Sequence, residues 1–360
     1  MGASLIRIKL SARLRAFTLN GFIVNGMKGL TDIEGLRVGH ASDFDAVTGC
    51  TVILCAQTGG GLPGREGAVA GVDVRGGAAG ERELETLRPG HLVERIHAIV
   101  LAGGSAFGLD AAGGVMRWLE EQGIGFDTGV ARVPIVPAAI IFDLGIGDPR
   151  RRPDSAMGYE AAKRATSDAV EEGSVGAGTG ATVGKLFGVK RATKGGLGTA
   201  TVTLGGGVRV AALAVVNAFG DVCDPATGRI IAGARASETS AEFVDTVAQM
   251  KGGAARSSFG SPAPTNTTLA VVATDARFDK LAVTKIAALA QNGLARTIAP
   301  VHTMFDGDVV FALSLGEKTA DVNAVGTAAV EAVAAAIVRA VTTARGLGGV
   351  PAIEDLKKRG

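Results

Sequence analysis

The hydrophobic positions of this chain follow two periods, and their alternation predicts a mixed α/β fold. Short apolar runs that end at glycine or polar residues are typical of strands, whereas apolar residues three or four positions apart are typical of helices. Before residue 250 these patterns predict strands at 36–41, 50–55, 98–104, 132–144, 198–206 and 208–217. They predict helices at 106–123, 155–173 and 237–250.

Two of these segments carry further signals. Pro134 and Pro137 weaken the beginning of the strand predicted at 132–144, because proline cannot donate to a strand ladder. Asp154 or Ser155 is expected to cap the helix that follows, since both side chains accept hydrogen bonds from free amides of a first helical turn.

The residues from 267 onward repeat the alternation as a unit of their own. The patterns there predict a strand at 267–276, a helix at 279–292, a strand at 308–315 and an Ala-rich helix at 320–344. The segment Lys251–Asn266 in front of this unit is small and polar, holds two prolines and three glycines, and shows no periodicity. This composition predicts a loop, so an irregular segment enters a buried strand at Asn266-Thr267.

Composition narrows the class of protein. Apolar residues make up 47% of the chain and aromatic residues only 4%, so a large core has to be built from Ala, Val, Leu and Ile. The 37 basic and 35 acidic residues lie mixed along the chain and give a net charge of +2, which argues against nucleic acid as a partner. We expect no membrane span, because no apolar run reaches about 18 residues.

The cysteines and the N-terminus bear on where the protein resides. Three cysteines do not make a disulfide framework, and Cys50 and Cys55 are predicted on opposite faces of one strand, so a cytoplasmic setting is expected. Basic residues interrupt the apolar residues before Met27, so no secretory signal is predicted. We interpret residues 1–28 as a poorly ordered leader or mis-started N-terminus, and residues 29–360 as one α/β domain.

The Asn266-Thr267 junction carries the candidate chemistry. A threonine hydroxyl is a poor nucleophile until a base removes its proton, and the free α-amino group of an N-terminal threonine can be that base. The ordinary pKa of this amine, about 7.7–8.0, leaves part of it unprotonated near neutral pH. The amine exists only if the preceding bond is cut by attack of the Thr267 hydroxyl on the Asn266 carbonyl. Taken alone, the same residues also fit the beginning of an ordinary strand.

Eight motifs, in order, resemble the L-aminopeptidase/D-esterase family, which includes β-aminopeptidases and nylon-oligomer (6-aminohexanoate oligomer) hydrolases. They are LTDIEGLRVGHASD, VDVRGGAAGERE, IVLAGGSAFGLDAAGGVMRWLEE, VPIVPAAIIFDL, GAGTGATVGK, VVNAFGDV, TNTTLAVVATDA and HTMFDGDVVFALS. The resemblance covers nearly everything from about Gly29 to Arg345, and its motifs are most similar to the nylon-oligomer branch.

The resemblance implies roles for individual residues. Thr267 matches the nucleophile and Asn266 the residue whose carbonyl is attacked, so Asn266-Thr267 is the expected self-cleavage site. Lys185 matches a lysine beside the nucleophile, which polarises the hydroxyl or keeps the amine neutral by like-charge repulsion. Asn217 matches an asparagine whose side-chain amide donates to the developing oxyanion.

Three more residues follow from the same resemblance. Asp306 and Asp308 match an acidic pair that orients the α-amine, and on a strand the two side chains would point to one face. Phe142 stands where several members of the family have a tyrosine whose hydroxyl helps the oxyanion. Because a phenyl ring cannot donate a hydrogen bond, either Asn217 and backbone N–H groups suffice for the oxyanion, or Phe142 changes the substrate pocket and the substrate range.

Each residue also has an ordinary structural explanation. Lys185 fits a solvated lysine, Asn217 a turn residue and Asp306-Gly307-Asp308 a turn before a strand. Gly260-Ser261 is a rival cut site, although Pro262 follows it and no strand begins there.

Cofactors and metals find no support in the sequence. The glycine loop 176–184 imitates a dinucleotide fingerprint but lacks the preceding strand and the later acidic residue, so we expect it to shape the floor of the nucleophile site. No cofactor is predicted, and no metal, because the four histidines lack ligand spacing.

The resemblance also implies an architecture and an assembly. We expect an αββα sandwich of the aminopeptidase/ornithine acetyltransferase kind, cut into an α fragment (29–266) and a β fragment (267–360) and assembled as a homotetramer or larger homo-oligomer of αβ units. The expected substrates are small peptides, β-amino amides or nylon-type oligomers. The alternatives are an acyltransferase like ornithine acetyltransferase, whose usual cut follows alanine, and an uncleaved scaffold without catalysis.

Overall fold

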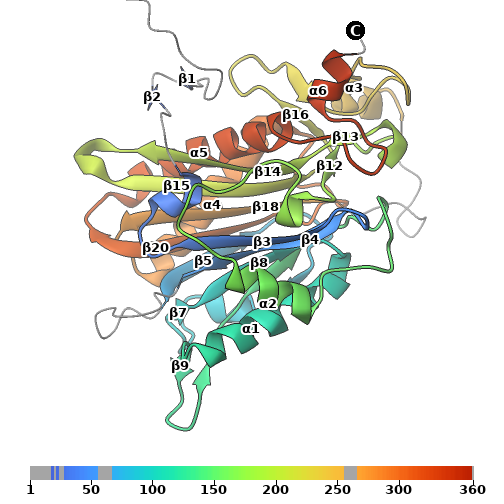
Figure 1. The fold of residues 1–360 in the computed structure, drawn as a ribbon. Coiled ribbons are helices and arrows are strands. Elements are labelled where there is room, and N and C mark those ends of the chain that lie inside the picture. The colour runs from blue at the N-terminus through green and yellow to red at the C-terminus, as the bar shows by residue number, and fades with distance from the viewer. Residues whose placement is uncertain (1–17, 20–21, 24–27, 56–66, 255–265, 359–360) are drawn as a thin grey trace, which may run out of the picture.

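Two β-sheets packed face to face, with helices on both outer faces, make up the body of the computed structural model (Figure 1). The structure describes residues 18–19, 22–23, 28–55, 67–254 and 266–358. The predicted mixed α/β class and its order of helix, sheet, sheet and helix layers are therefore present in this part of the chain. Most of the predicted leader, and the rival cut site Gly260-Ser261, lie outside the described residues.

The first sheet has six strands and holds the strand that begins at Thr267 near its centre. Its strands lie in the order β14 (Gly196–Thr203), β15 (Arg209–Asn217), β18 (Thr267–Ala276), β20 (Val309–Lys318), β5 (Ala68–Val74) and β7 (Arg95–Ile96). β18 and β20 are parallel, and helix α4 (Lys280–Thr297) supplies the crossover that a parallel pair requires. Together with α5 (Val322–Thr342), α4 covers the outer face of this sheet.

The second sheet has five strands and lies against the inner face of the first. Its order is β3 (Arg37–Asp43), β4 (Thr48–Leu54), β8 (Ala98–Ala102), β11 (Ala138–Ile140) and β6 (Glu81–Arg82). Helices α1 (Ala111–Glu121) and α2 (Ser155–Lys163) pack on its outer face, with α2 lying against β3 and β4.

The two-residue period of the strands produces these layers. On β15, Leu213 points into the core between the two sheets, whereas its neighbour Ala212 points toward the helices. The helix layer approaches closely because its contact positions are small. A Cβ atom on Gly198 of β14 would lie only 2.2 Å from the carbonyl oxygen of Ala336 on α5. The glycine and alanine content therefore permits a tightly packed core with few aromatic residues.

The remaining elements are short and lie around the two sheets. The strands are β1 (Thr18–Leu19), β2 (Phe22–Ile23), β9 (Phe126–Asp127), β10 (Arg132–Val133), β12 (Thr182–Val183), β13 (Thr193–Lys194), β16 (Asp221–Cys223), β17 (Ile230–Ala232) and β19 (Ile298–Ala299). The helices are α3 (Thr246–Lys251), α6 (Ile353–Lys357) and the 3-10 turns η1 (Gly29–Asp32), η2 (Glu85–Leu87), η3 (Ser105–Asp110), η4 (Gly176–Gly178), η5 (Val189–Arg191) and η6 (Gly205–Gly207).

The helix predicted at 155–173 is wrong in its second half. Asp154 caps α2 as expected, since its side chain accepts from the backbone N–H of Met157 at 2.8 Å. The helix ends at Lys163 because the chain beyond it pairs with the second sheet. Thr166 exchanges two backbone hydrogen bonds with Val38 of β3, at 2.9 and 3.1 Å.

The helix predicted at 237–250 is also mostly wrong, because only Thr246–Lys251 (α3) is helical. The residues before it form an irregular pair instead, in which Val244 donates to Ala234 and Ala236 donates to Glu242. Asp245 then begins the helix by accepting from the N–H of Ala248 at 2.9 Å. Local hydrogen bonds of this polar segment therefore replace the predicted first two turns.

Helix α5 is long and apolar enough to span a membrane by length and composition alone. The most apolar 18-residue window of this 21-residue helix has a mean hydropathy of 1.7, although Glu331 and Arg339 interrupt the apolar run. The helix packs against β14, β15 and α4, and 72% of its most apolar window is buried inside the protein. Core packing accounts for its composition.

The cysteines lie as predicted. Cys50 faces the core beneath α1 and α2, and Cys55, directly after β4, faces the core between the sheets. Both thiols are free and buried.

Candidate active site

Thr267 is the first residue of β18 and is buried at the edge of the core between the sheets. Its pairing partner across the sheet is Asn217, the last residue of β15. On the other side, Asn266 forms a parallel bridge with Asp306 in the segment that leads into β20. The structure thus brings four of the sequence-predicted residues together from three separate segments.

The bond between Asn266 and Thr267 is held by a set of short hydrogen bonds. The Thr267 hydroxyl donates to the carbonyl oxygen of Asn266 at 2.6 Å, and the Gly307 N–H donates to the same oxygen at 2.8 Å. The backbone N–H of Asn266 donates to the carbonyl oxygen of Phe305 at 2.7 Å. The hydroxyl and the carbonyl of the predicted cut site are therefore already in contact.

Lys185 and Asn217 form a buried pair next to this junction. The Lys185 Nζ donates to the backbone carbonyl oxygen of Asn217 at 2.9 Å and to its Oδ1 at 2.6 Å. Lys185 is only 1% exposed, so it is not a solvated lysine. Its position is set by the glycine loop, in which the N–H of Thr182 also donates to Asn217 Oδ1, at 3.0 Å. This loop contacts the site as expected.

These contacts fix the orientation of the Asn217 amide. Because Oδ1 accepts from two donors, Nδ2 must face the other way, where it donates to the backbone carbonyl oxygen of Phe142 at 3.1 Å. Phe142 thus meets the site through its main chain, and its half-buried ring adds no polar group.

A second buried lysine supports the glycine loop. The Lys194 Nζ donates to the carbonyl oxygens of Thr179 and Ala181, at 2.7 and 2.8 Å. Burial lowers the pKa of Lys194 to about 7, although the nearby Asp143 opposes this shift. Sequence reasoning missed Lys194, which carries no motif signal beyond its place in a strand-like run.

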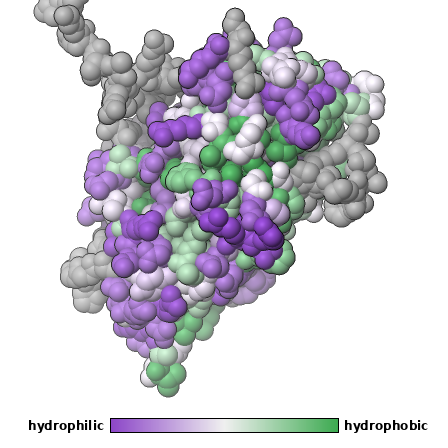
Figure 2. Space-filling view, turned by 45° about the vertical axis from the view of Figure 1, so that its right-hand side comes forward, coloured by the Kyte–Doolittle hydropathy of each residue, from purple (hydrophilic) through white to green (hydrophobic). Residues whose placement is uncertain are grey.

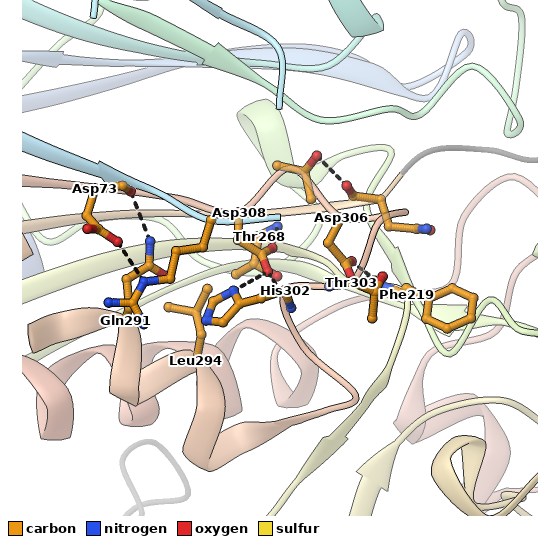
Figure 3. Close-up of polar contacts among 12 residues, drawn as sticks. Asp73, Phe219, Thr268, Gln291, Leu294, His302, Thr303, Asp306 and Asp308 are labelled. Carbon is orange, nitrogen blue, oxygen red and sulfur yellow. Dashed lines mark hydrogen bonds and ion pairs between the residues drawn. The ribbon is translucent and has the colours of Figure 1, made fainter. Parts of the chain in front are cut away.

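Asp306 stabilises the turn before β20. Its carboxylate accepts from the N–H of Phe219 at 3.1 Å, and from the N–H and hydroxyl of Thr303 at 3.1 and 2.6 Å (Figure 3). Burial, and then the negative charge of Asp308, raise the pKa of Asp306 to about 6.

Asp308 binds a different set of groups. Its carboxylate accepts from the N–H of Thr268 at 2.7 Å and contacts His302 through both the backbone N–H, at 3.1 Å, and Nδ1, at 2.8 Å (Figure 3). The strand predicted from Asp308 begins one residue later, at Val309, so both aspartates precede β20, and their carboxylates accept from separate groups. Asp308 fixes the main chain directly after Thr267.

His302 and a pair of glycines are parts of the site that sequence reasoning missed. His302 has a positive φ of 55° and touches Asp308 from a turn, a geometry that spacing alone does not predict. Gly76 and Gly77 lie against the segment of Asp306, where a Cβ on Gly76 would approach the Asp306 carbonyl oxygen to 2.4 Å. In the sequence, only the Gly-Gly pair of VDVRGGAAG indicated that two segments approach closely here.

No group of three His, Cys, Asp or Glu side chains is arranged to hold a metal ion within the described ranges. At the junction the structure brings together a hydroxyl, a carbonyl, a buried ammonium group, an amide and two carboxylates.

Comparison with known proteins places this geometry in context. The model of peptidase family S58 matches residues 28–353. An uncharacterized aminopeptidase of Mycobacterium tuberculosis is 42% identical over 92% of this chain and 98% of that protein. A 6-aminohexanoate-oligomer endohydrolase of a Kocuria species is 32% identical over 79% of this chain and 74% of its own.

A solved structure shares the fold. The L-aminopeptidase D-Ala-esterase/amidase of Ochrobactrum anthropi, described as a variant of the Ntn hydrolase fold, superposes with a TM-score of 0.68. The match covers 92% of this chain and 93% of that one, at 20% identity.

Proposed function

The chain belongs to peptidase family S58, and we propose from this that it hydrolyses amide bonds with Thr267 as an N-terminal nucleophile. The family and the aminopeptidase-named relatives support a peptide-bond hydrolase. The observation that carries the finer proposal is the 2.6 Å contact between the Thr267 hydroxyl and the Asn266 carbonyl oxygen, at the first residue of a central strand.

The first step we propose is self-cleavage. The Thr267 Oγ bonds to the carbonyl carbon of Asn266, and the π electrons move onto the carbonyl oxygen. The C–N bond then breaks and the hydroxyl proton goes to the Thr267 nitrogen, which leaves an ester on Oγ and a free α-amine. Water hydrolyses the ester, releasing the carboxylate of Asn266 and restoring the hydroxyl.

The second step repeats this chemistry on a substrate. The new α-amine takes the proton of the Thr267 hydroxyl, Oγ attacks the substrate amide, and the leaving amine receives the proton. Water then hydrolyses the acyl ester. In this proposal Asn217 and Lys185 form the polar surroundings of the nucleophile, whereas Asp306 and Asp308 hold the main chain that orients the α-amine.

The substrate class follows from the relatives and stays a proposal. Small peptides, β-amino amides and 6-aminohexanoate oligomers all present an amide that Thr267 can attack, and one relative is named for the last of these. With Phe142 in place of a tyrosine, the range is expected to depend on the pocket rather than on a phenol donor.

We also propose that the protein works as a homo-oligomer of αβ units. The hairpin β9–β10 projects from the second sheet, and its tip shows apolar residues at the bottom of Figure 2. Val130 on this hairpin is 94% exposed, which is the kind of surface that subunit contacts cover.

Intact mass of the purified protein tests the proposed function directly. We expect two fragments with the masses of residues 1–266 and 267–360 in place of the single 36.1 kDa chain, the smaller beginning with Thr267. The processed protein should release amine from 6-aminohexanoate oligomers or β-amino amides. Rates unchanged by a competing amine acceptor support a hydrolase, and acyl transfer to that acceptor supports an acyltransferase. A chain that stays in one piece for days would contradict the proposal.

The raised pKa of Asp306 predicts a pH dependence. The α-amine must be neutral, and Asp306 must be ionised to accept its three hydrogen bonds, so activity requires two groups to lose protons. The α-amine is already protonated below its own pKa, and Asp306 also becomes protonated below its pKa of about 6. A plot of log kcat/KM against pH should therefore approach a slope of about 2 below pH 6, measured where circular dichroism shows intact protein.

The variant Asp306→Asn supplies the control for this profile. Its side chain does not titrate, so the slope on the acid side should fall to about 1 while overall activity drops. Equal slopes for the variant and the natural protein would remove Asp306 from the pH dependence.

A further inference from the structure

The carbonyl oxygen of Asn266 accepts a second hydrogen bond besides the one from the Thr267 hydroxyl. The Gly307 N–H donates to it at 2.8 Å, opposite the main-chain bond from the Asn266 N–H to the Phe305 carbonyl oxygen at 2.7 Å. The Asn266 side chain adds a bond from its Nδ2 to the same Phe305 oxygen at 3.2 Å. This short parallel bridge holds the carbonyl against the segment 305–307.

The Gly307 N–H is rigid because its segment is held on its other side as well. Gly77 donates to the Thr303 carbonyl oxygen at 3.1 Å, Ala78 donates to that of Asp306 at 2.9 Å, and Arg75 donates to that of Asp308 at 2.8 Å. A donor fixed in this way needs no reorganisation when charge develops on the oxygen it faces.

Close approach of this second segment also explains why residue 307 is glycine. A Cβ atom at Gly307 would lie 2.6 Å from the carbonyl oxygen of Ala78 and 2.7 Å from the Cα of Ala79. Any larger residue would push the segment away from Ala78 and displace the N–H from the Asn266 carbonyl.

The side chain that the family resemblance suggested as oxyanion donor is engaged elsewhere in the uncut chain. The Asn217 Oδ1 faces Lys185 and Thr182, and its Nδ2 donates to the Phe142 carbonyl oxygen. The two donors on the Asn266 carbonyl oxygen are instead the attacking hydroxyl of Thr267 and the N–H of Gly307.

We propose that the backbone N–H of Gly307 is an oxyanion donor, first for self-cleavage and then for substrate hydrolysis. This inference rests on the proposed function. When Oγ of Thr267 bonds to the Asn266 carbon, the negative charge develops on the oxygen that Gly307 already contacts. The acyl-enzyme is an ester of the same Oγ, so the substrate carbonyl takes the place that the Asn266 carbonyl occupies in the uncut chain.

Replacing the amide N–H of Gly307 with an ester oxygen tests the proposal, since it removes the donor and leaves the side chain and the backbone shape in place. The full chain can be made by cell-free translation with glycolic acid incorporated at position 307. The same replacement at Gly123 is the matched control, because it removes a backbone hydrogen bond of the same 2.8 Å length, to the Glu120 carbonyl oxygen at the end of α1, on the outer face of the second sheet.

We expect the ester at 307 to slow self-cleavage about 100-fold, and to lower kcat per processed chain by a similar factor, with KM nearly unchanged. The ester at 123 should change both rates by less than about threefold. Equal rates for the two ester proteins would overturn the inference while the natural chain still cuts. A natural chain that does not cut would instead overturn the proposed function.

A second measurement needs no change to the backbone and covers the case in which an ester protein does not fold. Amide hydrogen exchange at Gly307 is followed in the processed natural enzyme, with and without a peptide boronate that forms a tetrahedral adduct on Thr267 Oγ. We expect the adduct to slow exchange at Gly307 about tenfold, with Gly123 unaffected. Exchange at Gly307 that is as fast with the adduct as without it would overturn the inference.

Discussion

Replacing Thr267 with alanine is expected to leave the chain in one piece and without amide hydrolase activity. The substitution removes both the attacking hydroxyl and its 2.6 Å contact with the Asn266 carbonyl oxygen, and without the cut no α-amine forms. Removal of the nucleophile in hydrolases of this general type lowers turnover by more than about 10⁴-fold. Intact mass and the release of amine from 6-aminohexanoate oligomers are the two measurements.

The variant Thr267→Ser is the matched control for this experiment. It keeps the hydroxyl and loses only a methyl group, so it should still produce the two fragments and retain activity within about tenfold. A Thr267→Ala chain that splits at the same bond would remove Thr267 from the mechanism, whatever its effect on activity.

Replacing Lys185 with methionine is expected to slow self-cleavage and kcat/KM by about 10³-fold, at the upper end of the effect of losing one charged donor. Methionine fills a similar volume but takes away the two hydrogen bonds to the carbonyl oxygen and Oδ1 of Asn217. Asn217 is the pairing partner of Thr267, so its displacement reaches the nucleophile directly. Pulse-labelled chain followed on a denaturing gel gives the rate of cutting.

Lys280→Met separates this effect from simple loss of stability. Lys280 is also buried, and its Nζ donates to the carbonyl oxygens of Thr86 and Val93 at 2.6 Å each. Both variants should lose about 1–3 kcal/mol of unfolding free energy, because each removes two hydrogen bonds that a buried ammonium group donates. Only Lys185→Met should lose the cut, and equally slow cutting in both variants would refute a specific role for Lys185.

Sequence patterns located most of the long strands, although β5 (Ala68–Val74) was not predicted and the segment 132–144 holds only the short strands β10 and β11. The period of two along Thr267–Ala276 predicted β18 with its observed bounds, because the same alternation places successive side chains in two different cores. The helix predictions at 155–173 and 237–250 were too long. Their ends depend on partners distant in sequence, such as Val38 for the segment beyond Lys163.

At the candidate site, too, some features could be predicted from the sequence and others could not. The motifs pointed to residues that the fold does bring together, since Asn217 pairs with Thr267 and Asp306 bridges to Asn266. Their individual contacts could not be predicted, because they depend on a turn whose shape is set by other segments. His302, which holds the Asp308 carboxylate, lies in that turn and has no spacing that marks it. The roles proposed for these residues remain predictions until the variants are measured.

The order of strands in the six-stranded sheet has a consequence for the proposed cut. β18 and β20 come from the fragment after Asn266, yet they lie between β15 and β5, which both belong to the fragment before it. The two strands of residues 267–360 would thus lie between strands of residues 1–266 and complete their sheet. Separating the two fragments would break the β15–β18 and the β20–β5 pairings at once. A backbone cut before Thr267 would therefore free an amine while the two fragments stay together.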